Sequence, residues 1–253
     1  MPKNLLDFSG QVVLVTGGRS GIGAATAVAF AEQGATVVVA GRSNADDTMA
    51  KIKDAGAEGL FIKCDVSQAT EVEATIATII EKFGRLDVAF NNSGLLPVTA
   101  DLINQTEEDF DQIISVDLKG VFLCMKYEIP PMLKQGGGAI INCGSIVSLT
   151  ADPGMAPYVA AKHGVAGLTK AAGIEYIKNN IRINLIAPGF TNTEMTAGWL
   201  ADPDFAEMVK GFNAAHRWAD PSEMVGLVLY LASPMASFCA GSIIPVDAGQ
   251  AAH

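Results

Sequence analysis

A hydroxyl, a phenol and an ammonium group lie close together in the sequence between residues 139 and 162. Ser145 precedes Tyr158 by thirteen residues, and Lys162 follows it by four. If the second segment is helical, the spacing of four places the phenol and the ammonium on one face. A tyrosine titrates near pH ~10, so proton transfer near neutrality requires a pKa lower by roughly three units, or about 4 kcal/mol, much of which a fixed ammonium can supply. The alternative interpretation is an ordinary amphipathic helix.

The composition describes a compact protein with a substantial core. Of 253 residues, 49% are hydrophobic and only 17% are charged, an apolar-rich composition that favours a compact globular protein. The length suits one large α/β domain or two small ones. The chain has no run of eighteen apolar residues, and residues 1–7 lack the apolar core of a signal peptide, so we expect a soluble, cytoplasmic protein without membrane contact.

Charge and metal-ligand content argue against two further classes of site. The formal net charge is −10, whereas binding nucleic-acid phosphates requires clustered Lys and Arg. Four cysteines lie far apart among apolar neighbours, and only three histidines occur. Neither set has the spacing of metal ligands, so we expect no nucleic-acid partner and no metal.

A strand, a glycine turn and a helix are predicted near the N-terminus. Gln11 to Thr16 is an apolar, β-branched run, residues 17–23 follow with the spacing Gly-x-x-x-Gly-x-Gly, and Ala24 to Gln33 has helical composition. Glycines let the backbone approach a pyrophosphate, and a helix N-terminus offers free N–H groups to it. The pattern therefore favours nucleotide binding over a purely structural turn.

Basic residues follow the second predicted strand, Ala35 to Ala40. At this place a nucleotide-binding sheet reads the adenosine ribose, where an acid suits NAD and an arginine pairs with the 2′-phosphate of NADP. The sequence has Gly41 and Arg42 there, with Arg19 in the glycine turn as a second cation. We predict NADP(H) over NAD(H), the alternative being that both arginines are solvated surface charges.

Helices and strands continue to alternate along the chain, which predicts a parallel sheet covered by helices on both faces and organised as one domain. A long helix is expected from Thr106 to Lys134, with Asp117 inside it and an interruption at Pro130–Pro131. A strand from Ala139 to Cys143 then delivers Ser145 to the carboxyl edge of the sheet, and Tyr158 opens the next helix. The other expected elements are helices at 44–55, 68–83 and 221–231 and strands at 59–64, 86–91 and 241–246.

Six motifs together resemble the short-chain dehydrogenase/reductase family, and they span nearly the whole chain in the family's order. They are Thr16–Gly23, Asp65–Val66, Asn91–Gly94, Ser145, Tyr158–Lys162 and Pro188–Thr193. The resemblance implies a single-domain Rossmann-type doubly wound fold, with a mainly parallel seven-stranded sheet and helices on both faces. It also implies a homotetramer.

The resemblance assigns a role to each motif. Tyr158 would be the general acid/base, Lys162 would lower its pKa and hold the nicotinamide ribose, and Ser145 would orient the reacting oxygen. Residues of the five motifs other than Ser145, with Arg42, would contact the cofactor: Gly17, Arg19, Ser20, Gly21, Ile22, Gly23, Arg42, Asp65, Val66, Asn91, Ser93, Gly94, Tyr158, Lys162, Pro188, Gly189, Thr191 and Thr193.

Asp117 departs from the family pattern, which has Asn at this place as part of a water-linked proton relay behind the lysine. If the relay uses the backbone carbonyl, Asp retains the role. A buried carboxylate near Lys162 would equally raise the pKa of the lysine or shift the pH optimum. We count Asp117 among the candidate catalytic residues.

The segment from residue 190 to 219, here called the lid segment, differs among family members and closes over substrate. Its large apolar side chains suggest a pocket for apolar or aryl ketones, the alternative being that they only pack the segment onto the domain. They are Met195, Trp199, Leu200, Phe205, Met208, Phe212 and Trp218.

Three functions remain open at this stage. The first is an NADPH-dependent carbonyl reductase that acts reversibly as a secondary-alcohol dehydrogenase on a small-molecule ketone or alcohol. The second is a 3-oxoacyl-[acyl-carrier-protein] reductase, which needs a basic docking patch. The third is a non-catalytic dinucleotide-binding regulatory or scaffold protein, which would be expected to lose Ser145, Tyr158 or Lys162.

Overall fold

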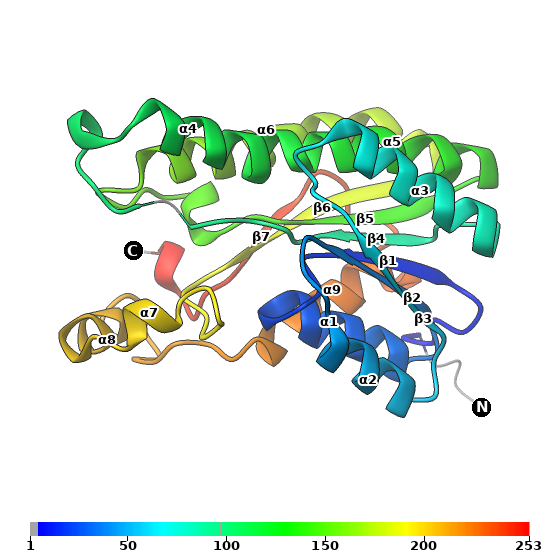
Figure 1. Cartoon of the computed structure of the whole chain (residues 1–253), viewed down its shortest axis with the longest axis horizontal. Helices are drawn as coiled ribbons and strands as arrows, with labels where there is room; N and C mark the ends of the chain where they lie inside the picture. Colours follow the sequence, from blue (N-terminus) through cyan, green and yellow to red (C-terminus); the bar gives the residue numbers. More distant parts are fainter. Residues whose placement is uncertain (1–4, 97, 253) are drawn as a thin grey trace.

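Seven parallel strands form one twisted sheet in the order β3-β2-β1-β4-β5-β6-β7 (Figure 1). The computed structural model describes residues 5–96 and 98–252. The order reverses between β1 and β4, so the connections that leave the carboxyl ends of these neighbouring strands go to opposite faces of the sheet, and open α/β sheets bind ligands at this place. The strands are β1 Val12–Thr16, β2 Thr36–Gly41, β3 Gly59–Lys63, β4 Val88–Asn91, β5 Gly138–Cys143, β6 Ile181–Pro188 and β7 Ile243–Val246.

Helices cover both faces of the sheet (Figure 1). On one face lie α1 Gly21–Glu32, α2 Asp46–Asp54 and α9 Ser222–Ala232. On the other lie α3 Ala69–Phe83, α4 Glu107–Ile113, α5 Gly120–Gln135 and α6 Ala156–Tyr176. The predicted doubly wound fold is confirmed, and every strand pairing among the described residues is parallel. None of the helices in the described ranges combines the length and apolar character needed to cross a membrane.

Two hydrophobic cores follow from the alternation of side chains along the strands. In β1, Val12 and Leu14 join the core under α3, α5 and α6. Val13 and Val15 face the core under α1 and α9 instead. Because both faces are covered, the strand is apolar without a polar face. Truncating Leu14, which is 2% exposed, to alanine would cost about 2–5 kcal/mol.

The expected interruption at Pro130–Pro131 is wrong. Both prolines lie inside α5, which continues to Gln135 and ends at Gly136 with a φ of +88°. Prolines remove two backbone donors, but burial of Ile129 and Met132 in the core holds this turn in place. The irregular stretch lies earlier, where a π-helical turn, Ile114–Lys119, joins α4 to α5 and carries Asp117.

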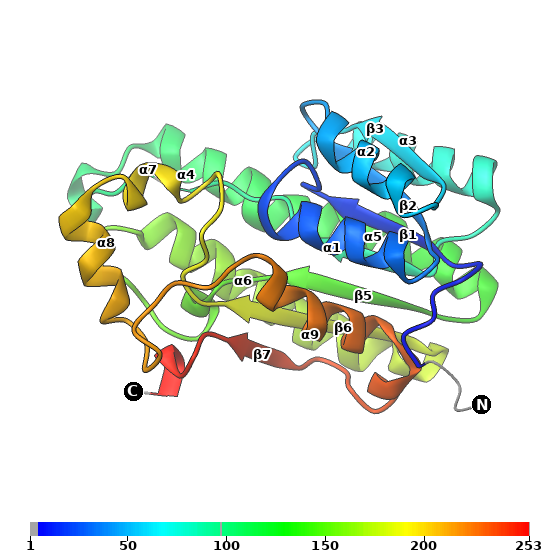
Figure 2. The same ribbon diagram turned by 90° about the horizontal axis from the view of Figure 1, so that it is seen from below.

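The lid segment projects beyond the carboxyl ends of the strands (Figure 2). It contains two short helices, α7 Ala197–Leu200 and α8 Pro203–Lys210. Short 3₁₀ turns occur elsewhere at Leu102–Asn104, Ile146–Ser148, Ile177–Asn179, Pro234–Ala236 and Gln250–Ala252.

Candidate active site

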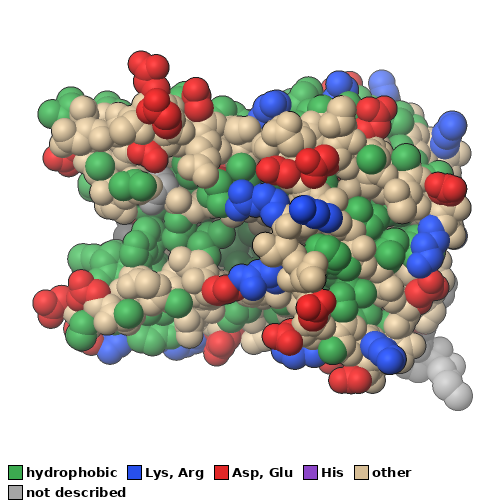
Figure 3. Space-filling model, viewed as in Figure 1, with side chains coloured by type: hydrophobic (Ala, Val, Ile, Leu, Met, Phe, Trp, Pro, Cys, Tyr) green, Lys and Arg blue, Asp and Glu red, His purple; other side chains and the backbone are tan. Residues whose placement is uncertain are grey.

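A cleft of about 1130 Å³ opens at the carboxyl edge of the sheet. Its walls come from the glycine turn, the ends of the central strands, the start of α6 and the lid segment. Figure 3 shows the hollow, with apolar side chains inside it and charged side chains around it. Residues far apart in sequence therefore share one cavity, as parallel topology requires.

Ser145, Tyr158 and Lys162 all line this cleft. Ser145 follows β5 and caps the 3₁₀ turn Ile146–Ser148, accepting a hydrogen bond from the backbone N–H of Val147. Tyr158 and Lys162 lie one helical turn apart near the start of α6, and the Lys162 Nζ lies 5.3 Å from the centroid of the Tyr158 ring. The predicted spacing thus places the phenol and the ammonium on one helix face.

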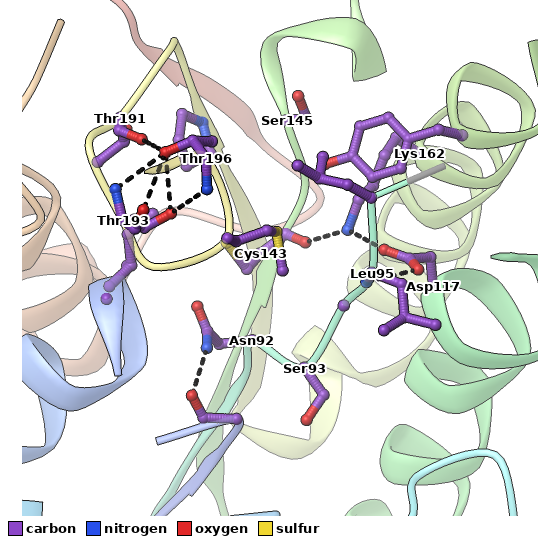
Figure 4. Close-up of a pocket in the computed structure, with 18 of the residues that line it drawn as sticks. Asn92, Ser93, Leu95, Asp117, Cys143, Ser145, Lys162, Thr191, Thr193 and Thr196 are labelled. Carbon is purple, nitrogen blue, oxygen red and sulfur yellow. Dashed lines mark hydrogen bonds and ion pairs between the residues drawn. The ribbon is translucent and has the colours of Figure 1, made fainter. Parts of the chain in front are cut away.

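Lys162 is held by two oxygen atoms, as Figure 4 shows. Its Nζ lies 3.0 Å from Oδ1 of Asp117 and donates a hydrogen bond of 3.3 Å to the carbonyl oxygen of Cys143. The lysine side chain is 5% exposed. Burial is the largest single influence on the pKa of Lys162 and lowers it, but the neighbouring groups, Asp117 foremost, together outweigh burial and raise the pKa. The ammonium therefore stays charged at neutral pH.

Asp117 is fully buried in the π-helical turn. Its Oδ2 accepts a hydrogen bond of 2.9 Å from the backbone N–H of Leu95, in the loop that follows β4. Burial raises the pKa of Asp117, opposed by Lys162 and by this N–H group. The carboxylate thus links the π-helical turn to the lysine and to the loop after β4. π-Helical turns frequently occur at functional sites.

The pKa of Tyr158 is raised, contrary to the expected lowering. Burial is the main cause, and Asp117 acts in the same direction. Lys162 lowers the pKa, as does hydrogen bonding with Ser145, but neither offsets burial. The Asp117 carboxylate compensates the lysine charge, so the phenol holds its proton at neutral pH.

The glycine turn is shaped for close approach of a ligand to the backbone. Gly17 has a φ of +65°, and a Cβ there would lie 3.0 Å from the Cα of Ser93. Thr16 Oγ1 accepts hydrogen bonds from the backbone N–H groups of Asn92 and Ser93, at 3.0 and 3.1 Å. The side chain of Ser20 caps no N–H group of α1, so the positive end of the helix faces the cleft.

The two arginines predicted to read the ribose differ in their partners. Both line the cleft. Arg19 forms an ion pair with Glu194 of the lid segment, and this pairing lowers the pKa of Glu194. Arg42 has no hydrogen bond or ion pair with any described residue. Arg42 is therefore the cation in the cleft that is available to a ligand phosphate.

Two predicted cofactor residues do not line the cleft, Gly23 and Asn91. A Cβ at Gly23 would lie 2.4 Å from the carbonyl oxygen of Gly17, so this glycine allows the turn to pack on α1. Asn91 is 1% exposed and faces the core. Its Nδ2 donates to Oε2 of Glu128, at 3.1 Å, and to Oδ1 of Asn142, at 3.0 Å. The Asn91 side chain is therefore part of the core network, and its predicted contact with the cofactor stays a prediction.

The remaining predicted site residues all line the cleft. They are Gly17, Arg19, Ser20, Gly21, Ile22, Arg42, Asp65, Val66, Ser93, Gly94, Asp117, Ser145, Tyr158, Lys162, Pro188, Gly189, Thr191 and Thr193. Figure 4 shows Thr191 and Thr193 in a loop braced by Thr196, whose Oγ1 donates to the Thr191 carbonyl oxygen at 2.7 Å. No group of three or more His, Cys, Asp or Glu suited to hold a metal occurs in the described part of the chain.

The lid segment contributes an aromatic group to the cleft. The rings of Phe190, Trp199 and Phe205, here called the aromatic trio, have centroids 5.6 to 6.3 Å apart. Met195, Met208 and Phe212 line the cleft beside them. Leu200 and Trp218 do not line it, so the lid segment uses its apolar residues both for the cleft and for packing.

Sequence reasoning missed several lining residues, among them Asn92, Leu95, Thr99 and Asp152. Asn92 lies within a recognised motif, and its Nδ2 donates to the carbonyl oxygens of Thr16 and Gly17. The other three lie in loops after β4 and β5. Their positions in loops at the carboxyl edge of the sheet could have identified them as candidate lining residues.

Comparisons with known proteins agree with this geometry. Residues 17–251 match a protein-family model described as enoyl-(acyl carrier protein) reductase. The chain is 40% identical to a short-chain dehydrogenase/reductase of Aspergillus oryzae, over 98% of each chain. It is 39% identical to a cyclohexanol dehydrogenase of an Acinetobacter species, over 95% of this chain and 94% of that protein. The crystal structure of levodione reductase superposes with a TM-score of 0.94 at 35% identity, over 97% and 99% of the two chains.

Proposed function

The chain belongs to the short-chain dehydrogenase/reductase family and is an NAD(P)-dependent oxidoreductase of alcohol and carbonyl groups; from this premise we propose that it reduces a ketone to a secondary alcohol with NADPH. The reaction is reversible, and Tyr158 is its general acid and base. The observation that carries the proposal is the single cleft that Ser145, Tyr158 and Lys162 share with the glycine turn and Arg42.

The residues at one end of the cleft fit a dinucleotide. Gly17 lets the glycine turn pack closely on the loop after β4, because a Cβ there would contact Ser93, and the backbone of this turn lines the cleft. The uncapped N-terminus of α1 offers N–H donors to the phosphates. Arg42, without a partner among the described residues, supplies the bidentate cation that suits a 2′-phosphate. These features support NADP(H) in preference to NAD(H).

When bound, the nicotinamide cofactor supplies the hydride in reduction and accepts it in oxidation. The Ser145 hydroxyl donates a hydrogen bond to the carbonyl oxygen and orients it. Tyr158 transfers its phenolic proton to that oxygen, which matches a phenol that is protonated at neutral pH. Lys162 stabilises the resulting phenolate by its charge. In oxidation the same phenolate removes the alcohol proton.

The substrate end of the cleft supports apolar, ring-containing ketones. The aromatic trio and the neighbouring methionines present large apolar surfaces there. Cyclohexanol is the substrate in the name of one relative, and a cyclic ketone of that size suits such walls.

The carrier-protein alternative has less support. Acyl carrier proteins are acidic, so docking needs a basic patch around the mouth of the cleft. Figure 3 shows Lys and Arg side chains beside the hollow itself, whereas acidic side chains lie on the two arms at its open end; the first turns of α4 and α8 are acidic. The non-catalytic alternative has no support from the cleft, because it contains Ser145, Tyr158 and Lys162 together.

We also propose a homotetramer located in the cytoplasm. Phe122 and Leu133 of α5 and Ile174 of α6 are exposed at 46%, 40% and 75%, and burying such side chains favours association. All four cysteines are free thiols, as expected in a reducing compartment. Sedimentation velocity gives the mass directly, and a monomer at micromolar concentration would contradict the tetramer.

Initial rates with NADPH and NADH across a panel of ketones test the proposed activity. We expect turnover of cyclic and aryl ketones, with NADPH preferred. Arg42→Ala is expected to reduce that preference by about tenfold or more, because an ion pair with phosphate contributes about 1.5–3 kcal/mol. Arg217→Ala, which removes an arginine outside the cleft, is the control. No ketone reduced with either cofactor would contradict the proposal.

A further inference from the structure

Seven charged residues line the cleft, and five of them have partners. Lys162 pairs with Asp117, Arg19 pairs with Glu194, and Asp65 accepts hydrogen bonds from the backbone and hydroxyl of Ser67. The two others, Arg42 and Asp152, have no ion pair or hydrogen bond with any described residue. Arg42 lies at the cofactor end. Asp152 is thus the unpaired charge of the substrate end.

Asp152 lies in the loop between Ser145 and Tyr158, and that loop is fixed by its neighbours. The carbonyl oxygen of Gly154 accepts hydrogen bonds from the backbone N–H of Ala100, at 3.1 Å, and from Nε2 of Gln105, at 3.0 Å. The same Nε2 donates to the carbonyl of Ala100. The carboxylate is therefore presented by a braced loop, in a position to meet a ligand without large rearrangement.

The surroundings of Asp152 contain no compensating cation. Its pKa is raised, and burial by the cleft walls is the cause. A nearby Lys or Arg would have acted in the opposite direction. The residue is exposed by its accessible surface and its carboxylate has no partner among the described residues, so a cation entering the cleft could pair with it directly.

The aromatic trio supplies a second feature that suits a cation. Phe190, Trp199 and Phe205 line the same cleft as Asp152. Trp199 belongs to α7 and Phe205 to α8, and Figure 1 shows these two helices on the opposite side of the sheet from α6. Aromatic faces attract alkylammonium groups and cover their methyl groups. An amine between these walls would contact rings on one side and a carboxylate on the other.

The acidic character of the protein also favours a cationic ligand. Acidic side chains lie on the two arms at the open end of the hollow, while Lys and Arg side chains lie beside the hollow itself (Figure 3). The first turns of α4 and α8 carry Glu107, Glu108, Asp109 and Asp204. The whole chain carries a net charge of −10. Such a field raises the local concentration of cationic ligands and lowers that of anionic ones.

We propose that Asp152 is a specificity-determining residue that selects ketones carrying a cationic amine, with the aromatic trio covering the alkyl groups of the ammonium. This inference rests on the proposed ketone reductase activity. It narrows the substrate class from apolar cyclic ketones to amphipathic ones. Anionic ketones are disfavoured by the same carboxylate.

Three 4-substituted cyclohexanones of similar size and different charge test the inference. They are 4-(dimethylamino)cyclohexanone, which is cationic near neutral pH, its neutral isostere 4-isopropylcyclohexanone, and the anion 4-oxocyclohexanecarboxylate. We expect kcat/KM to fall from cation to neutral to anion, with about a tenfold advantage of the cation over its isostere, the size of one exposed ion pair plus a cation–π contact. In Asp152→Asn the advantage should fall to about twofold or less.

Glu108→Gln is the matched control, because it removes one negative charge from the mouth outside the cleft lining. It should retain the cation advantage and leave kcat/KM for the isostere unchanged. Equal rates for cation and isostere in the wild type, or an undiminished advantage in Asp152→Asn, would overturn the inference.

The inference and the proposed function fail in different ways. Absence of any turnover of 4-isopropylcyclohexanone would contradict the proposed function. In that case the affinity for the amine still decides the inference. It is measured by quenching of tryptophan fluorescence in the wild type and in Asp152→Asn. Equal affinity of the two proteins would overturn it, and a loss of about tenfold in the variant would support it.

Discussion

Two buried carboxyl groups, Asp117 and Glu128, lie eleven residues apart on the same helical run, and they behave differently. Both are 0% exposed. Asp117 faces a buried ammonium and a backbone N–H group. Glu128 receives one hydrogen bond, from Asn91, and its Oε1 has no partner. Burial raises the pKa of both carboxyls, so the difference in their chemistry comes from their different partners.

The contrast sets different protonation states. Burial raises the pKa of Glu128 to about 8, and the hydrogen bond from Asn91 only partly opposes it. Glu128 is therefore mostly protonated at neutral pH. Its network continues through Asn91 and Asn142 to Thr169 of α6, which ties β4 and β5 to the helices. The Asp117 pair is at the cleft wall, whereas the Glu128 network is structural.

Breaking the ion pair between Asp117 and Lys162 should have the largest effect on both stability and activity. Lys162→Met leaves Asp117 buried without its cation, which costs about 3–5 kcal/mol of unfolding free energy. It also removes the charge beside Tyr158, so kcat should fall by about 10²–10³-fold. Denaturant unfolding and steady-state kinetics measure the two losses.

A double variant separates these losses. Lys162→Met with Asp117→Leu removes both charges and should recover most of the stability without recovering activity. Recovery of kcat in the double variant would show that Lys162 has no catalytic role.

Replacing Glu128 by glutamine should have an effect of intermediate size on stability. It should raise the free energy of unfolding, whereas Lys162→Met lowers it. The folded state holds the Glu128 proton up to about pH 8, whereas the unfolded state releases it near pH 4.5. Stability therefore falls as the pH rises from about 4.5 to about 8. Glu128→Gln removes this fall and should be more stable than the wild type by on the order of 3 kcal/mol at pH 7.

Thermal unfolding measured against pH checks this result. The two proteins should agree near pH 4 and diverge up to about pH 8. Glu73→Gln, on an exposed face of α3, should show no such pH dependence. A wild type that gains stability relative to Glu128→Gln at alkaline pH would mean that Glu128 is ionised and paired.

Asp117→Asn should change the pH profile more than the rate. Asp117 raises the pKa of Tyr158, so its removal lowers that pKa while Lys162 remains charged. Alcohol oxidation needs the phenolate, and its rising limb should therefore move to lower pH. The falling limb of ketone reduction should move in the same direction. Profiles identical to those of the wild type would mean that the Asp117 charge has no effect on Tyr158.

The same two carboxyls show how far sequence reasoning reached. Periodicity and motif order predicted the parallel sheet, which the structure confirms, because strands and glycine turns are local signals. Asp117 was recognised as a departure, but its π-helical turn carries no comparable signal. Pro130–Pro131 suggested an interruption that tertiary burial of Ile129 and Met132 overrides.

The features that the sequence did not predict depend on contacts between residues that lie far apart in the chain. The Asn91 side chain follows Ala89 onto the face covered by α5, and Glu128, its partner there, lies far away in sequence. The raised pKa of Tyr158 depends on Asp117, forty-one residues earlier. Lid packing likewise decides that Trp199 lines the cleft and Trp218 does not.

The central claim is that Tyr158 transfers the proton while NADPH supplies the hydride. It is tested most directly by single-turnover oxidation of NADPH with 4-isopropylcyclohexanone, in the wild type and in Tyr158→Phe, with NADPH affinity measured in parallel. We predict unchanged NADPH affinity and a loss of rate of about 10²–10⁴-fold in the variant, the size of general acid catalysis. A variant that binds NADPH normally and retains the rate within about threefold would contradict the account.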